Sequence, residues 1–240
     1  MSGVTLAVIG DVHAHWAHLA TVLDAIDAED PDGVLLVGDL GDPALGRAPV
    51  RDFARRAAYL RSLEELWERV EARGRPYLWV PGNHDLPDLV GERNVDGRSA
   101  VLAGLTVAGL GGGGPARFGF PYEWGEDEVR RRVLPPHDVL LSHAPPSDCT
   151  LDVLKGQDVH VGSVAVRELA ERLSGFLVCG HIHESGGVEQ IGQCLCLNAG
   201  GLGRPWGAPQ VGFLQRTATH DSVWHVDLVS GARTMLGRAR

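Results

Sequence analysis

Five short polar blocks in this sequence carry side chains that bind metal ions and transfer protons. In chain order they read Asp11-Val12-His13, Gly38-Asp39-Leu40-Gly41-Asp42, Gly82-Asn83-His84-Asp85, Ser142-His143 and Gly180-His181-Ile182-His183. A spacing of two places Asp11 and His13 on one side of an extended chain, and the same holds for His181 and His183. Carboxylates and imidazoles together suit manganese, iron, zinc or nickel. Each pair is therefore expected to chelate one ion or to bracket two.

The donors in these blocks outnumber the ligands of a single tetrahedral ion. The candidate ligands are Asp11, His13, Asp39, Asn83, His143, His181 and His183. A set of this size fits two ions that share one carboxylate. Asp39 lies between the other ligands along the chain, which makes it the natural bridge. The sequence therefore predicts a centre for two metal ions.

Each block directly follows a short apolar run that predicts a β-strand. The five runs are residues 4–9, 34–37, 77–80, 139–141 and 176–179. Functional sites in open α/β sheets form outside the carboxyl ends of the strands, so we expect the blocks to face one crevice. Apolar residues at three- and four-residue spacing predict helices at residues 13–28, 50–72 and 163–173. Three later strands are expected at residues 194–197, 211–214 and 222–229.

The order of these elements predicts an α/β fold with one mixed sheet, or two stacked sheets, flanked by helices. Residues 1–240 show no repeat, long linker or low-complexity tract, so we expect a single domain. The glycine run 111–114 is expected to form a turn between strands, although close approach to a phosphate is the alternative.

Composition excludes several classes of function. The chain has 240 residues and a formal net charge of −9, and Lys155 is its only lysine. A Walker A loop needs a lysine followed by serine or threonine, and that motif is absent. The acidic balance argues against a stable complex with nucleic acid. No apolar run of 18 residues predicts a membrane span, and no signal-peptide pattern opens the chain. We therefore expect a cytoplasmic protein with reduced, buried cysteines.

The five ordered blocks resemble those of the calcineurin-like metallophosphoesterases, over about residues 4–200. Within that superfamily the chain is similar to small prokaryotic phosphoesterases related to the Icc-type cyclic-nucleotide phosphodiesterases. The narrower likeness lies in residues 142–146, 160–163 and 180–186. The resemblance implies a four-layer α/β/β/α sandwich, in which two mixed sheets are flanked by helices.

The resemblance also implies a role for each residue. One metal would take Asp11, His13, Asp39 and His183, and the second would take Asp39, Asn83, His143 and His181. His84 matches the family's catalytic histidine and would not be a ligand. Asp42 and Asp85 match carboxylates near that histidine, with Asp42 the better candidate to orient it. Pro43-Ala44 replaces the Arg-Gly of the family's protein phosphatases, which argues against that activity.

The expected function is hydrolysis of a small phosphoester by a dinuclear metal centre. Two divalent or transition metal ions, with manganese favoured and iron, nickel or zinc as alternatives, would hold a bridging hydroxide that attacks phosphorus. His84 would assist the leaving group. A phosphodiester, such as a cyclic nucleotide, is favoured over a phosphomonoester or free nucleotide. A noncatalytic interaction module of the same fold is the alternative from another class, and the filled ligand positions argue against it.

Three further residues have open roles at this level. His160 precedes Gly162-Ser163 in a loop beside the expected site, and is a candidate substrate contact. Tyr122 and Trp124 follow the glycine run and are expected either to stack on a substrate base or to cap the core. The oligomeric state, the native metal pair and the natural substrate are left open by the sequence.

Overall fold

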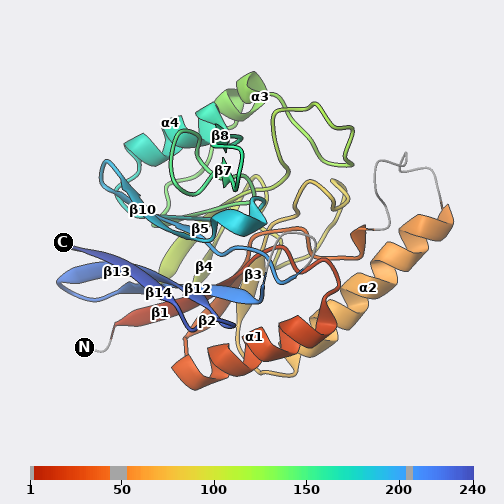
Figure 1. Cartoon of the computed structure of the whole chain (residues 1–240), viewed down its shortest axis with the longest axis horizontal. Helices are drawn as coiled ribbons and strands as arrows, with labels where there is room; N and C mark the ends of the chain where they lie inside the picture. Colours follow the sequence, from red (N-terminus) through yellow and green to blue (C-terminus); the bar gives the residue numbers. More distant parts are fainter. Residues whose placement is uncertain (1–2, 44–52, 204–207) are drawn as a thin grey trace.

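The computed structural model describes residues 3–43, 53–203 and 208–240. Two six-stranded mixed sheets pack face to face within these ranges (Figure 1). The strands are β1 Val4–Ile9, β2 Gly33–Leu36, β3 Tyr77–Trp79, β4 Ser99–Leu102, β5 Leu105–Leu110, β6 Val139–Ser142, β7 Val153–Leu154, β8 Val159–His160, β9 Phe176–Cys179, β10 Gly187–Ile191, β11 Cys194–Asn198, β12 Gln210–Arg216, β13 His220–Asp227 and β14 Arg233–Ala239. The helices are α1 Trp16–Glu29, α2 Phe53–Glu71, α3 Glu126–Arg131, α4 Val164–Arg172 and the 3-10 helix η2 His183–Ser185.

The first sheet has the strand order β14-β13-β12-β1-β2-β3. β1, β2 and β3 run parallel, whereas β12 joins β1 antiparallel and leads into the β13–β14 meander. The second sheet has the order β10-β11-β9-β6-β5-β4, with a parallel centre and an antiparallel strand at each edge. The parallel strands of both sheets carry the predicted site blocks at their carboxyl ends.

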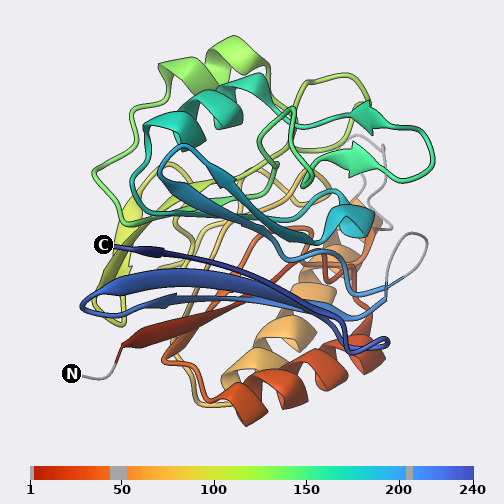
Figure 2. The ribbon, with the colours of Figure 1, turned by 60° about the vertical axis from the view of Figure 1, so that its left-hand side comes forward.

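Three apolar clusters separate the four layers of the sandwich. Alternation along β1 sends Leu6 and Val8 into the cluster between the sheets, and Ala7 and Ile9 into the cluster beneath α1 and α2. A third cluster fills the space between the second sheet and the α3–α4 layer. Figures 1 and 2 show the two helix layers on opposite sides of the sheets. The predicted α/β/β/α architecture is confirmed, because the two stacked sheets lie between one layer that holds α1 and α2 and another that holds α3 and α4.

Element boundaries differ from the sequence predictions by a few residues. The helices predicted at 13–28 and 163–173 form as α1 and α4. The helix predicted at 50–72 forms as α2 from Phe53, and residues 50–52 lie outside the described ranges. The prediction omitted α3 and six strands, which are β4, β5, β7, β8, β10 and β14.

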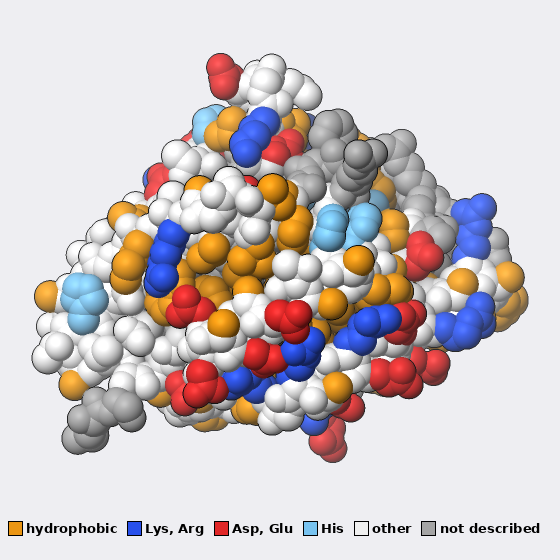
Figure 3. Space-filling model, turned by 60° about the horizontal axis from the view of Figure 1, so that its bottom comes forward, with side chains coloured by type: hydrophobic (Ala, Val, Ile, Leu, Met, Phe, Trp, Pro, Cys, Tyr) orange, Lys and Arg blue, Asp and Glu red, His pale blue; other side chains and the backbone are white. Residues whose placement is uncertain are grey.

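The outer surface on the side of α1 carries charges of both signs. Arg73 and Arg75 pair with acidic residues of α1 and of the turn that follows it, among them Asp27 and Asp30. Figure 3 views the molecule from this side and shows acidic and basic side chains interleaved, with hydrophobic side chains between them. Among the described residues, no helix has both the length and the apolar character needed to cross a membrane.

Candidate metal centre

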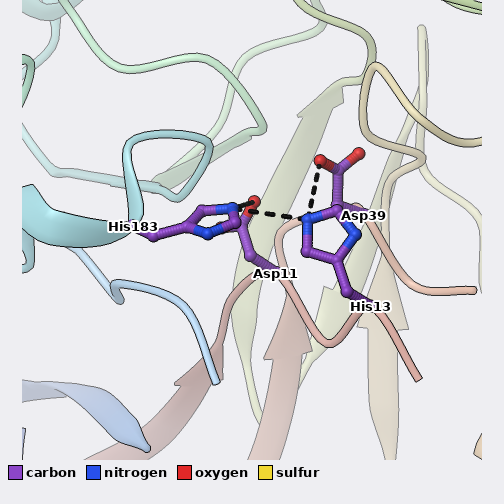
Figure 4. Close-up of side chains that lie close together, drawn as sticks. All are labelled: Asp11, His13, Asp39 and His183. Carbon is purple, nitrogen blue, oxygen red and sulfur yellow. Dashed lines mark hydrogen bonds and ion pairs between the residues drawn. The ribbon is translucent and has the colours of Figure 1, made fainter. Parts of the chain in front are cut away.

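The predicted blocks from five separate strands meet at the carboxyl ends of both sheets. Four side chains form a compact group whose candidate ligand atoms lie within 4.8 Å of one another (Figure 4). They are Asp11, His13, Asp39 and His183. His183 Nε2 lies 3.1 Å from Asp11 Oδ1 and 3.3 Å from His13 Nε2. These residues are the four that the resemblance assigns to the first metal.

The second predicted set converges on the side-chain oxygen of Asn83. His143 Nε2 lies 2.8 Å from Asn83 Oδ1, and His181 Nδ1 lies 2.9 Å from the same atom. His143 Nε2 is also 3.6 Å from Asp39 Oδ1. Asn83 and His143 are buried, so their donor atoms face one another rather than bulk water.

Asp39 connects the two sets through its two carboxylate oxygens. Its Oδ2 lies 3.4 Å from His13 Nε2, on the side of the first set. Its Oδ1 faces His143 and accepts a 2.9 Å hydrogen bond from the backbone N–H of His84. The carboxylate therefore stands between the two donor sets, which is the position that the sequence predicts for a bridge.

Burial and mutual attraction prepare these side chains to bind cations. Burial lowers the pKa of His13 to about 4 and that of His181 to about 3. Burial alone would raise the pKa of Asp11 and Asp39, but the neighbouring imidazoles lower it below the ordinary value in both cases. At neutral pH the carboxylates are therefore charged, and His13 and His181 are neutral, as metal ligation requires. His183 differs, because Asp11 raises its pKa although burial opposes the charge.

The hydrogen bonds of His143 fit a bound metal. Its Nδ1 donates to the Val37 carbonyl at 2.8 Å, which fixes the ring and turns Nε2 toward Asn83 Oδ1, 2.8 Å away. A single cation could bind both of these atoms. The donor set therefore fits metal ions of the kind that imidazole, carboxylate and amide oxygen bind.

Two glycines permit the close approach of the loops after β2 and β3. A Cβ added to Gly82 would lie 2.1 Å from Asp39 Oδ1, and one added to Gly38 would lie 2.5 Å from the Gly82 nitrogen. Gly38 also has φ +105°, which side-chain-bearing residues rarely adopt. These positions explain why glycine opens both blocks.

Several ligands themselves have left-handed backbone conformations. The φ angles are 45° at Asp11, 44° at His13, 51° at Asp39 and 70° at His181. Each such residue costs about 1 kcal/mol or more relative to an ordinary conformation. The hydrogen bond from His13 N to Asp39 O, at 2.9 Å, is one of the contacts that hold this strained turn.

His84 lies beside the first donor set without joining it. Its ring is edge-on to His13, with centroids 5.2 Å apart, and packs against Phe120 at 4.2 Å. His84 Nδ1 is buried and has no hydrogen-bond partner among the described residues. Neither Asp42 nor Asp85 therefore orients the ring through that atom. The backbone N–H of Asp42 donates to Ser62 Oγ at 2.8 Å.

Asp85 instead joins the loops that carry Asp39 and Asn83. Asp85 is buried, with 1 % of the residue exposed. Its carboxylate accepts hydrogen bonds from the N–H groups of Leu40, Gly41 and Gly82 and from the Tyr59 hydroxyl, the last at 2.7 Å. Burial, followed by repulsion from Asp39, raises the pKa of Asp85. The contacts make Asp85 a link between two site loops.

A cleft of about 480 Å³ opens beside the second donor set and is lined in part by Asn83 and His181. His160 lines it from β8, and Arg117 and Phe118 line it from the opposite loop. The glycine run forms part of the same wall, because Gly113 and Gly114 also border the cleft. The structure thus brings His160 to the cleft, as the sequence expectation of a substrate contact requires.

Other residues near the site were not singled out by the sequence, or had open roles. Trp124 is buried and donates to the Gly111 carbonyl at 2.8 Å, so it caps the core rather than offering a stacking surface. Gln210 donates to the His183 carbonyl at 3.1 Å and supports that ligand. Neither contact has a local sequence signal. Phe120, which packs against His84, follows Arg117-Phe118-Gly119 in the sequence. The pair of phenylalanines in this loop is the one sequence feature that could have pointed to that contact.

Known proteins resemble this chain in sequence and in fold. A family model for calcineurin-like phosphoesterases matches residues 4–185. An uncharacterised protein of Methanocaldococcus jannaschii is 28 % identical over 182 residues, which cover 70 % of this chain and 81 % of that protein.

Two solved structures share the fold at low sequence identity. TT1561 of Thermus thermophilus superposes with a TM-score of 0.55 at 17 % identity, over 98 % of this chain and 99 % of that one. A single mutant of Vps29 from Entamoeba histolytica superposes with a TM-score of 0.51 at 14 % identity, over the same shares. Together with the ordered Asp and His cluster, the family match over most of the chain shows that the protein belongs to the calcineurin-like phosphoesterases.

Proposed function

We propose that this protein is a phosphodiesterase that works with two metal ions, of which manganese is the favoured species. The observation that carries the proposal is the Asp39 carboxylate, whose two oxygens face two separate sets of buried donors. Asp11, His13 and His183 would complete one site, and Asn83, His143 and His181 would complete the other. Bound ions would supply Lewis acidity and lower the pKa of a bound water.

The residues around the ligands support catalysis on a bound ester. His84 lies outside both donor sets but directly beside His13, so its ring can donate to a phosphoryl oxygen or to the departing oxygen without giving up a ligand role. Phe120 packs on the ring and limits its movement. The backbone N–H of His84 donates to Asp39, which ties the position of the ring to that of the bridging carboxylate.

The shape of the site supports a diester substrate. The cleft beside Asn83 and His181 is large enough, at about 480 Å³, for an organic group attached to the phosphate. Its wall is largely apolar, with Leu154, Val161 and Ile182 among its residues. A diester has a second organic group that can use this wall while its phosphate lies at the ligands. The expected partner is therefore a small phosphoester, and the four free, buried thiols fit a cytoplasmic location.

A screen of metals against substrates tests this proposal. Protein freed of metal with a chelator would be reloaded with Mn, Fe(II), Ni, Zn or Mg and assayed on bis(p-nitrophenyl) phosphate, p-nitrophenyl phosphate and cyclic nucleotides. We expect metal-dependent turnover with the diesters faster than the monoester. Faster turnover of the monoester would replace the proposal with a phosphomonoesterase. A protein that holds two ions but turns over none of these substrates would favour a noncatalytic module of the same fold.

A further inference from the structure

A buried carboxylate organises the segment that closes one side of the cleft. Asp152 is completely buried and accepts hydrogen bonds from the backbone N–H groups of Asp148, Cys149 and Gly162. It also lies 2.6 Å from Nδ1 of His160. Four donors from one continuous segment thus converge on one carboxylate. The arrangement fixes the β7–β8 segment and the His160 ring together.

This contact leaves one nitrogen of His160 for the cleft. The ring Nδ1 donates to Asp152, and 43 % of the side chain is exposed. No described residue bonds to Nε2 on the far side of the ring, while the ring itself lines the cleft. The hydrogen bond to Asp152 raises the pKa of His160 above its ordinary value, which favours a ring that is a donor at both nitrogens.

The carboxylates that border the cleft are already engaged. Glu126 accepts from the Ser163 hydroxyl at 2.8 Å and from the Ala165 N–H at 2.7 Å. Glu123 accepts from the Phe118 and Gly119 N–H groups. These contacts hold the walls of the cleft. Among the described residues that line it, the His160 donor, the Arg117 guanidinium and the apolar wall remain for a ligand.

We propose that the Asp152–His160 pair is the specificity element of the cleft. His160 Nε2 would donate to an oxygen of the ester group that lies beyond the reacting phosphate, while the apolar wall receives the body of that group. Asp152 is the positioning residue that aims the ring. The preferred substrates are then diesters with a large, oxygen-bearing ester group such as a nucleoside. This inference rests on the proposed phosphodiesterase activity and concerns selectivity within it.

Two diesters with one leaving group test this inference. Thymidine 5′-(p-nitrophenyl) phosphate and methyl p-nitrophenyl phosphate both release p-nitrophenolate, so the ratio of their kcat/KM values measures the contribution of the retained ester group. We expect the manganese-loaded protein to prefer the thymidine ester. His160→Ala should lower that ratio about tenfold, the size of one lost hydrogen bond to a charged group. His160→Gln, which keeps a donor, should recover part of the ratio.

Asp152→Asn tests the positioning role with little change in volume. We expect it to lower the same ratio, mainly through a higher KM for the thymidine ester. His137→Ala is the matched control, because its Nδ1 also bonds to an acceptor, the Pro135 carbonyl, but it precedes β6 at the end remote from the ligands. That variant should leave the ratio unchanged. If Asp152→Asn fails to fold, His160→Ala and His160→Gln still test the specificity role.

The outcomes separate this inference from the proposed function. Absence of turnover on both diesters in the metal-loaded wild type overturns the proposed phosphodiesterase activity. Equal turnover of both diesters by the wild type refutes the specificity role and leaves the activity intact. Equal loss on both diesters in His160→Ala also refutes it, because the ratio would not change.

Discussion

Variants of Asp85 and of its partner Tyr59 can test whether the Asp85 carboxylate has a structural or a catalytic role. The sequence places Asp85 among candidate catalytic residues, next to His84. The structure surrounds its carboxylate with three backbone N–H groups and the Tyr59 hydroxyl, in a fully buried place. Removing the carboxylate would leave these donors without an acceptor. The loops that hold Asp39 and Asn83 would lose their common anchor.

The magnitude follows from the number of donors. Each buried donor left unsatisfied costs about 1 kcal/mol or more, so Asp85→Ala should lose at least about 4 kcal/mol of stability. A domain typically has about 5–15 kcal/mol in total, so that variant would be barely stable. Tyr59→Phe removes only one of the four bonds, at a cost of about 2 kcal/mol. For a chain of this length, that lowers Tm by roughly 4–8 °C.

The assay compares thermal melting, bound metal and turnover in Tyr59→Phe and in Asp85→Asn. Tyr59→Phe should melt earlier, keep two ions per chain and retain turnover within about threefold, because it leaves the ligands in place. Asp85→Asn should melt much earlier and bind metal less tightly. An Asp85→Asn protein with wild-type Tm, two tight ions and the turnover defect of a His84 variant would refute the structural role. An unchanged Tm in Tyr59→Phe would show that the hydrogen bond from Tyr59 contributes much less than about 2 kcal/mol to stability.

Three other variants extend these tests. His84→Ala should keep its metals but lose about 10²–10⁴-fold in turnover; metal analysis beside kinetics checks this, and loss of metal would contradict a role outside the ligand sets. Asp39→Ala should weaken binding of both ions, since one carboxylate faces both donor sets; titration calorimetry that finds two tight ions would exclude the bridge. Burial lowers the pKa of His225 from 6.5 to about 4. As pH falls from 6.5 towards 4, the unfolded chain takes up a proton at this residue before the folded protein does, so the free energy of unfolding falls by up to about 3 kcal/mol. Denaturant melts of the metal-free protein should show this slope together with those of His13 and His181, whose pKa values burial also lowers, and His225→Leu should make the total slope shallower; an equally steep slope in the variant would assign the pH dependence to the other groups.

The sequence predicted the strands that carry the site because their signals are local. An apolar run closed by a polar block marks β1, β2, β3, β6 and β9, and parallel strands deliver such blocks to a common edge. β14 gave no such signal, since it is an edge strand whose side chains are mostly exposed. β4 and β10 are edge strands too, and the two-residue strands β7 and β8 are too short to show any periodicity.

The same distinction between local and distant signals applies to the candidate site. The ligand sets could be predicted because each ligand lies within two residues of another polar group or at the end of a strand. The partners that hold them could not, since those contacts join distant parts of the chain. Gln210 reaches His183 from β12, and Tyr59 reaches Asp85 from α2. The pairing of Asp152 with His160 spans eight residues, with no motif to announce it.

The left-handed turns at Asp11, His13, Asp39 and His181 set the site against the preference of its own backbone. Glycine adopts these angles without strain, whereas each of these residues costs about 1 kcal/mol there. The two carboxylates offset part of that cost through the hydrogen bonds that they accept, from His181 N at Asp11 and from His84 N at Asp39. The ligand positions are therefore places where the fold gives up stability in order to hold metal-binding side chains.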